Sequence, residues 1–143
     1  MKKLILALFA GMFLLAGTSC KKDDKNCDVT VANISGTYKI LKVMYKLNAG
    51  TPETDYTSTI FESCHLDDLH VLNANGTYSY QLAGVDCAPP ETPYSDTWSL
   101  SGSTITIEGE SATISSFDCS TLNIVFADYN VAGDKATIKN KKQ

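Results

Sequence analysis

The part of the chain after residue 33 consists mostly of short segments in which apolar and polar residues alternate. A period of two places the apolar side chains on one face of a β-strand, and no segment after residue 20 keeps the 3.6-residue period of an amphipathic helix. We therefore predict an all-β domain with eight strands, at residues 34–47, 66–73, 77–83, 95–100, 104–108, 112–117, 122–127 and 135–139.

Short turns join most of these segments, which favours antiparallel pairing between sequence neighbours. Strands that are apolar on one side must bury that side against one another. We expect an antiparallel up-and-down eight-stranded barrel, in which side chains nearly fill the interior or leave room for one small ligand. An open β-sandwich of the same strands is the alternative. Closure would bring the lysine-rich first and last strands side by side.

The first strand segment contains an irregularity. Tyr38 and Ile40 share one phase of the alternation. Leu41, Val43 and Tyr45 share the other phase. A change of phase between adjacent residues predicts a β-bulge or a sharp bend in this strand.

The cysteines can be paired from a predicted hairpin. Two apolar segments around Asn-Ala-Asn-Gly predict a β-hairpin that turns at residues 75–76. Facing residues then have numbers that sum to about 150, a condition that Cys64 and Cys87 meet, so their sulfurs should be close enough to form a disulfide. The chain has five cysteines, and with Cys20 assigned to lipid the other four allow three pairings. The Cys64–Cys87 pair leaves Cys27 to pair with Cys119.

The first 19 residues have the layout of a cleavable export signal. Lys2 and Lys3 precede an apolar run over residues 4–16, and small residues then lead into Cys20. The run is shorter than the roughly 20 apolar residues of a membrane-spanning helix. We expect cleavage before Cys20 and lipidation of this cysteine. Secretion without lipid is the alternative, because Gly17 stands where lipoprotein signals more often carry Leu or Val.

The predicted organisation is a lipoprotein signal peptide over residues 1–19, a lipidated cysteine with a flexible polar tether over residues 20–33, and one folded domain over residues 34–143. The Lys-Asp-Asp of residues 22–24 resembles a signal that sends lipoproteins of some Gram-negative bacteria to the outer face of the outer membrane, and a solvated charge run is an equally good interpretation. We expect the protein in the cell envelope of a Gram-negative bacterium, lipid-anchored in the outer membrane and either periplasmic or surface-exposed.

The charge distribution argues against nucleic acid as a partner. Residues 47–134 contain 13 acidic residues and neither lysine nor arginine. Phosphate backbones are bound chiefly by lysine and arginine, so a domain with an acidic middle is a poor nucleic-acid binder.

Candidates for catalysis or metal binding are few. His65 and His70 are five residues apart, which in a strand would place them on opposite faces, and Cys64 is expected in a disulfide. The sequence has no Gly-x-Ser-x-Gly elbow and no glycine-rich phosphate loop. Glu108 and Glu110 are interpreted as solvated turn residues in preference to calcium ligands. We therefore expect no enzymatic activity, no metal and no cofactor.

Several residues with aromatic rings fall on the predicted inner faces. They could line a pocket for a mostly apolar ligand, or they could simply fill the interior. We expect residues 48–63 and the proline-rich loop at residues 88–93 to surround one mouth of the domain. The candidate ligand-lining residues are Tyr38, His70, Tyr78, Tyr80, Trp98 and Phe126.

The order of GTYKILKV, LHVLNANGTYSY flanked by two cysteines, DTWSLSGSTITI and CSTLNIVF is similar to the lipocalin-like domains of small lipidated envelope proteins of bacteria. Gly36 and Tyr38 stand where lipocalins place a Gly-x-Trp, with tyrosine in place of tryptophan. The resemblance spans roughly residues 34–139 and implies a lipocalin-like barrel. Lipocalins at large bind small apolar or amphipathic ligands, so the resemblance implies such a ligand here. We expect the membrane-anchored protein to be a monomer. A surface accessory protein that docks a glycan or an envelope protein is the alternative.

Lipidation can be tested by metabolic labelling with palmitate. We expect the mature protein to incorporate the label and the Cys20→Ser variant to incorporate none, because the thioether anchor requires that cysteine. A wild-type protein that stays unlabelled while it is exported would contradict the predicted anchor.

Overall fold

The computed structural model describes residues 27–143, and the predicted signal peptide, Cys20 and the first part of the tether lie outside the described residues. The described chain is an all-β protein with three helical segments of four residues each. The strands are β1 (Gly36–Lys46), β2 (Thr54–Asp55), β3 (Leu69–Leu72), β4 (Thr77–Gln81), β5 (Tyr94–Ser101), β6 (Thr104–Ile107), β7 (Glu110–Phe117), β8 (Thr121–Ala127) and β9 (Lys135–Lys142). The short helices are α1 (Val31–Ile34), α2 (Thr57–Ile60) and the 3-10 helix η1 (Ser63–Leu66).

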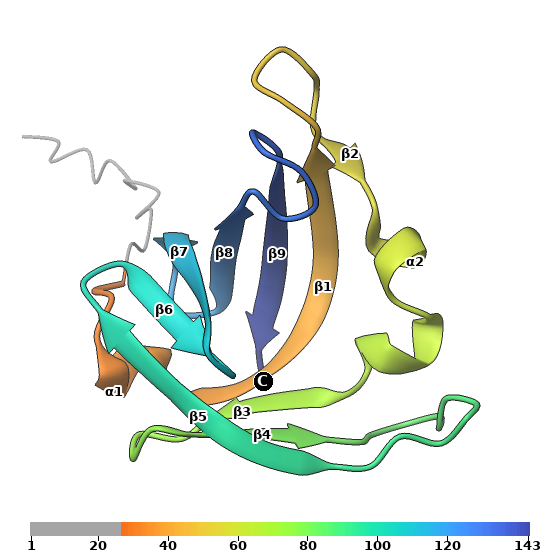
Figure 1. The fold of residues 1–143 in the computed structure, drawn as a ribbon. Coiled ribbons are helices and arrows are strands. Elements are labelled where there is room, and N and C mark those ends of the chain that lie inside the picture. The colour runs from red at the N-terminus through yellow and green to blue at the C-terminus, as the bar shows by residue number, and fades with distance from the viewer. Residues whose placement is uncertain (1–26) are drawn as a thin grey trace, which may run out of the picture.

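All nine strands belong to one antiparallel sheet in the order β2-β1-β3-β4-β5-β6-β7-β8-β9. β1 also pairs with β9, so the hydrogen bonding runs in a ring and the sheet curves around an interior (Figure 1). This confirms an all-β, antiparallel sheet in which most sequence neighbours pair. The eight predicted strands are all present, and the ninth is the two-residue β2.

β1 bends at the predicted irregularity. In its pairing with β9, Ile40 faces Asn140 and Lys42 faces Lys139, so Leu41 has no partner. The Leu41 side chain is 54% exposed. Below the bulge β1 pairs with β3 through residues 36–38, and above it β1 pairs with β2 through residues 44–45. The bulge therefore bends β1, so that its two halves run in different directions.

The β3–β4 hairpin has the predicted register. His70 faces Tyr80 and Leu72 faces Tyr78. The turn places Gly76 at a φ of 86°, a left-handed conformation that glycine adopts without steric cost.

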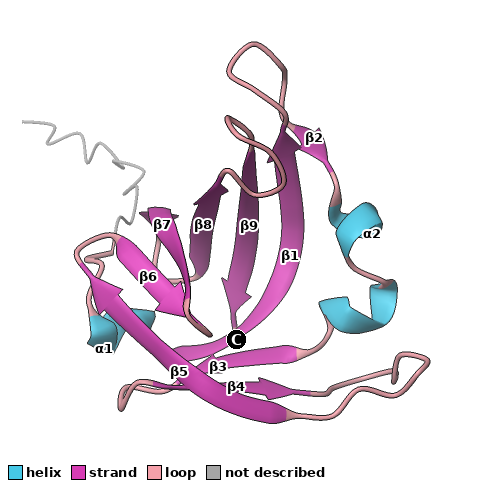
Figure 2. Cartoon of the chain, viewed as in Figure 1, coloured by secondary structure: helices cyan, strands magenta, loops and turns pink. Residues whose placement is uncertain are grey.

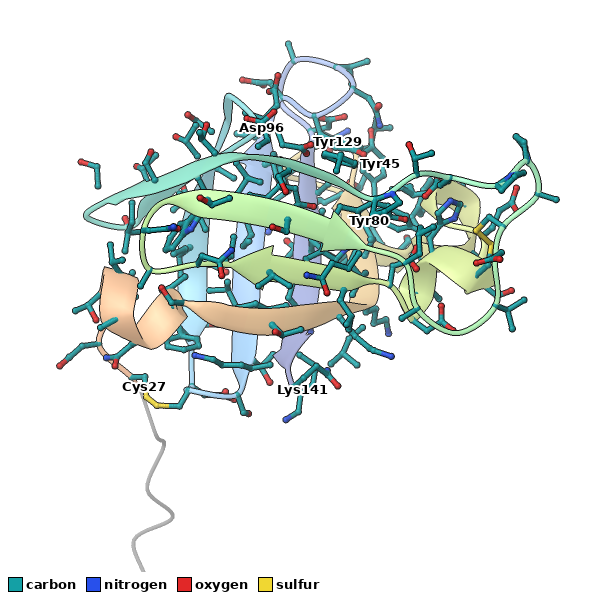
Figure 3. All side chains as sticks on the ribbon, turned by 90° about the horizontal axis from the view of Figure 1, so that it is seen from below. Cys27, Tyr45, Tyr80, Asp96, Tyr129 and Lys141 are labelled. Carbon is teal, nitrogen blue, oxygen red and sulfur yellow. A yellow bond between two sulfur atoms is a disulfide. The ribbon has the colours of Figure 1, made fainter. Side chains whose placement is uncertain are left out.

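Both expected disulfides are present, with Cα–Cα distances of 5.3 Å for Cys27–Cys119 and 5.4 Å for Cys64–Cys87. They lie at opposite ends of the molecule (Figure 3). The Cys27 N–H also donates to the Phe117 carbonyl at 2.9 Å, and Ile34 is fully buried. The disulfide and α1 therefore attach residues 27–33, which were expected in the flexible tether, to the core.

The segment between β1 and β3 is more ordered than its polar sequence indicates. The Asp55 carboxylate accepts hydrogen bonds from the backbone N–H and the hydroxyl of Thr57, at 3.0 and 2.6 Å. These bonds lower the pKa of Asp55 to about 2. The Thr57 hydroxyl in turn accepts from the Val43 N–H at 2.9 Å. This chain of bonds attaches α2 to the side of β1, as Figure 2 shows.

The buried side chains form two clusters. The larger extends from Ile34 through Trp98 to Leu122, and the smaller contains Ile40, Val43 and Ala136. Residues 27–143 supply both clusters and both disulfides. Within the same residues, no helix has the length and apolar character needed to cross a membrane.

Closure of the ring brings lysines together on the outer face of β1 and β9. We call the six lysines of the facing pairs Lys39–Lys141, Lys42–Lys139 and Lys46–Lys135 the lysine ladder. Lys42 forms an ion pair with Asp55 at 3.2 Å, and Lys135 forms one with Glu53 at 2.6 Å. Like charges directly opposite one another destabilise a strand pair, so the acidic residues in and beside β2 offset part of this cost.

We expect the two disulfides to stabilise the domain unequally. The Cys64–Cys87 bond spans 23 residues and the Cys27–Cys119 bond spans 92. A longer loop removes more entropy from the unfolded chain, so loss of the first bond should cost about 3 kcal/mol and loss of the second roughly 1 kcal/mol more. Urea unfolding of the two double Cys→Ala variants measures the difference. Equal losses, or a larger loss for Cys64–Cys87, would contradict this expectation.

Candidate functional site

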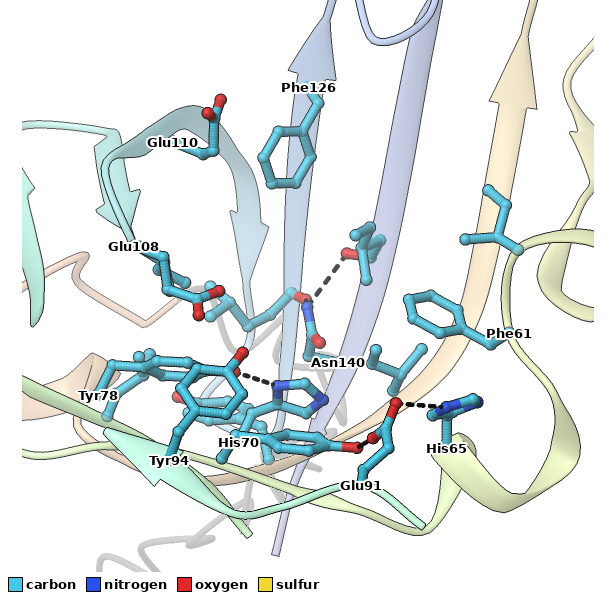
Figure 4. A pocket seen from close by; sticks show the side chains of 18 of the residues that line it. Phe61, His65, His70, Tyr78, Glu91, Tyr94, Glu108, Glu110, Phe126 and Asn140 are labelled. Carbon is cyan, nitrogen blue, oxygen red and sulfur yellow. Dashed lines mark hydrogen bonds and ion pairs between the residues drawn. The ribbon is translucent and has the colours of Figure 1, made fainter. Parts of the chain in front are cut away.

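The curved sheet contains an open cavity of about 870 Å³. Its wall comes from the inner faces of the strands, from the segment around α2 and η1, and from the loop before β5, as Figure 4 shows in part. Alternation along each strand explains the strand residues, because every second side chain points inward. The lining residues are Tyr38, Ile40, Ile60, Phe61, His65, His70, Leu72, Tyr78, Tyr80, Pro90, Glu91, Thr92, Tyr94, Ile107, Glu108, Glu110, Leu122, Phe126, Tyr129, Ile138 and Asn140.

Five of the six predicted ligand-lining residues lie in this wall, and Trp98 does not. Trp98 is 4% exposed, and its indole N–H donates to the Asn73 carbonyl at 2.7 Å, beneath the β3–β4 turn. Its inward phase was predicted from the alternation, but its position along β5 places it in the packed core instead of beside the cavity. The lining residues that were predicted are Tyr38, His70, Tyr78, Tyr80 and Phe126.

Four aromatic side chains pack together on one side of the cavity. The Tyr94 ring lies 5.3 Å from the Tyr80 ring and 6.1 Å from the Tyr78 ring, between centroids. The His70 ring lies 5.5 Å from the Tyr80 ring. Tyr94 comes from the start of β5, outside the segment that alternation marked, so it was not among the predicted lining residues.

His70 is held as a neutral side chain. Its Nδ1 and the Tyr78 hydroxyl form a hydrogen bond of 2.8 Å. Burial lowers the pKa of His70 and raises the pKa of Tyr78. Desolvation penalises the charged form of each group, so both are uncharged near neutral pH.

A second hydrogen-bonded chain crosses the wall near η1. Glu91 accepts from His65 Nε2 at 3.0 Å and from the Tyr80 hydroxyl at 2.5 Å. These bonds hold the pKa of Glu91 below its usual range, with the Tyr80 bond the larger cause. Tyr80 also contacts the buried Asp68, which accepts from the Ala83 N–H at 2.9 Å. Hydrogen bonds therefore connect His65, Glu91, Tyr80 and Asp68 in this wall, and His65 Nδ1 is left without a partner.

The two segments that were expected at the mouth both contribute residues to the cavity wall. Ile60 and Phe61 contribute from the region of α2, and Pro90, Glu91 and Thr92 contribute from the proline-rich loop. The Cys64–Cys87 disulfide joins the bases of these two segments, so it also restrains the mouth.

His65 and His70 both line the cavity. The expectation of opposite faces assumed one continuous strand, whereas His65 lies in η1 and only His70 lies in β3. Among the described residues, the group with a metal-like arrangement is Cys64, His65 and Cys87. The two sulfurs are joined in the disulfide, so neither is a thiolate ligand.

The neutral state of His70 predicts a pH dependence of stability. The unfolded chain binds a proton at His70 near pH 6.5, whereas the folded chain binds it only at lower pH. The free energy of unfolding should therefore fall as the pH drops through about 6.5 toward 5. We expect His70→Gln to make this slope shallower in thermal melts followed by circular dichroism.

His65→Gln is the control for that experiment, because His65 is the only other histidine of the chain. An unchanged slope in His70→Gln would contradict a buried, neutral His70.

Comparison with known proteins finds no family model, no curated protein and no solved structure that matches this chain.

Proposed function

We propose that this chain is a non-enzymatic, lipid-anchored protein of the bacterial cell envelope, in which a lipocalin-like domain binds a small apolar or amphipathic ligand. The observation that carries the proposal is the cavity of about 870 Å³ with aromatic and aliphatic walls. A volume of this size lies within the range of small-molecule sites, which are mostly apolar with a few polar groups.

A lipocalin-like barrel is the form of the sheet that we propose. The up-and-down strand order and the additional β1–β9 pairing support it. A closed sheet of about eight strands has room for one small ligand, and β2 extends only the side of β1. We propose that the protein acts as a monomer.

The export signal and Cys20 support an address outside the cytoplasm. Two disulfides agree with this address, because such bonds persist in oxidising compartments. Six residues lie between the proposed lipidated Cys20 and Cys27, which the disulfide attaches to the core, and this spacing would keep the domain close to the outer membrane.

Docking of a glycan or an envelope protein is the second candidate function. The lysine ladder favours it, since six lysines in facing pairs form a basic strip on an otherwise acidic domain. Charge complementarity then selects an acidic polysaccharide or an acidic protein surface as the partner. In this case the cavity would have no part in binding.

Ligand binding can be tested with N-phenyl-1-naphthylamine, an apolar fluorophore, and a soluble form that starts at Lys21. We expect saturable enhancement of its fluorescence. Ile138→Trp places an indole ring in the cavity and should weaken binding at least about tenfold by steric exclusion.

Leu41→Trp is the matched control, because it adds the same ring on the outer face of β1. Circular dichroism melts should verify that both variants fold. Absence of saturable binding by the folded wild-type domain, or equal binding by the two variants, would contradict the cavity function and favour the docking function.

A further inference from the structure

The cavity wall contains tyrosine hydroxyls that are already hydrogen-bonded and side-chain oxygens that can accept a further hydrogen bond. The Tyr38 hydroxyl donates to the Ile34 carbonyl at 2.6 Å. The Tyr80 hydroxyl is bonded to acidic side chains, and the Tyr78 hydroxyl is bonded to His70. These bonds are made to other groups of the protein, so the three hydroxyls are engaged before any ligand enters.

Asn140 contributes a free acceptor from β9. Its side chain is 8% exposed, and its amide nitrogen donates to the Leu122 and Ile138 carbonyls, each at 3.3 Å. The amide is therefore oriented with its carbonyl oxygen away from these partners. No donor from residues 27–143 bonds to this oxygen, and the side chain is part of the cavity wall (Figure 4).

Glu108 and Glu110 contribute two further acceptors on either side of the β6–β7 turn. Both are exposed at the rim, and neither forms an ion pair within the described part of the chain. The Glu108 charge acts toward the aromatic cluster, since it contributes to the raised pKa of Tyr94, after burial as the main cause. Figure 4 shows Glu108 beside the rings of Tyr78 and Tyr94.

No lysine or arginine lies among the lining residues. An alkyl carboxylate in this cavity would place its charge near two unpaired carboxylates with no cation to offset them. A protonated amine would instead meet carboxylates, an amide oxygen that can accept from N–H, and the faces of tyrosine and phenylalanine rings, which attract cations.

We propose that the ligand of this cavity is a lipophilic amine in its ammonium form, with the apolar part among the aromatic rings and the charged head near Glu108, Glu110 and Asn140. This inference rests on the proposed ligand-binding function and adds the sign of the ligand charge. The charges of Glu108 and Glu110, together with the Asn140 oxygen, select against a carboxylate head group of the same length.

Three probes with the same alkyl chain test the charge preference. Decylamine, decanol and decanoate are each used to displace N-phenyl-1-naphthylamine from the soluble domain at pH 7 and low salt. We expect decylamine to displace the fluorophore at about fivefold lower concentration than decanol and at least about tenfold lower than decanoate. The preference should shrink at high salt because the rim carboxylates are exposed.

The variant Glu108→Gln/Glu110→Gln should reduce the preference for decylamine over decanol to less than about twofold and leave decanol binding unchanged. Asp28→Asn/Asp86→Asn is the matched control, because it removes the same charge from exposed residues outside the cavity wall. This control should keep the preference.

The outcomes separate the two proposals. Saturable decanol binding without tighter decylamine binding would overturn the amine inference and leave the cavity function in place. A preference for decylamine that survives in the Glu108→Gln/Glu110→Gln variant would also overturn it. Failure of the fluorophore and of all three probes to bind would overturn the cavity function and the inference together.

Discussion

The pairing of β1 with β9 is the constraint on which the rest of the structure depends. This pairing joins the first long strand to the last, and β1 also pairs with β3 and β2 on its other edge. A straight strand could not follow both directions, and the unpaired Leu41 supplies the bend. The inner faces can then curve around an interior. On the outer face the β1–β9 pairing is destabilised by charge repulsion, because it places the lysines of the ladder opposite one another.

The cavity wall has buried hydroxyls that are already hydrogen-bonded and acceptor oxygens that a ligand can reach. Hydrogen bonds to neighbouring groups of the protein satisfy the hydroxyls of Tyr38, Tyr78 and Tyr80, so burying these hydroxyls carries little penalty. The free acceptors lie at the rim and on Asn140, where a ligand can reach them. A bonded wall fixes the shape of the cavity before binding, and this preorganisation reduces the entropy cost of taking up a ligand. The Cys64–Cys87 disulfide extends the same restraint to the mouth.

Much of the fold could be predicted because its signals are local. Alternation marked the eight main strands, the change of phase after Ile40 marked the bulge, and the hairpin turn brought Cys64 opposite Cys87. Other features depend on partners that are distant in sequence. Asp55 orders α2 only because Thr57 reaches β1. Residues 27–33 join the fold through the bond of Cys27 to Cys119 and through the hydrogen bond of the Cys27 N–H to Phe117.

The sequence by itself determined the strands, the cysteine pairs and the acidic middle of the chain, because each depends on spacing along the chain or on composition. Only the tertiary structure decided which side chains share the cavity. Glu91, His65 and Phe61 come from loops or short helices, where alternation does not set the direction of a side chain. Trp98 was correctly predicted to point inward but lies outside the cavity wall. Alternation predicts which face of a strand a side chain occupies, whereas the packing of the curved sheet decides which positions along that strand border the cavity.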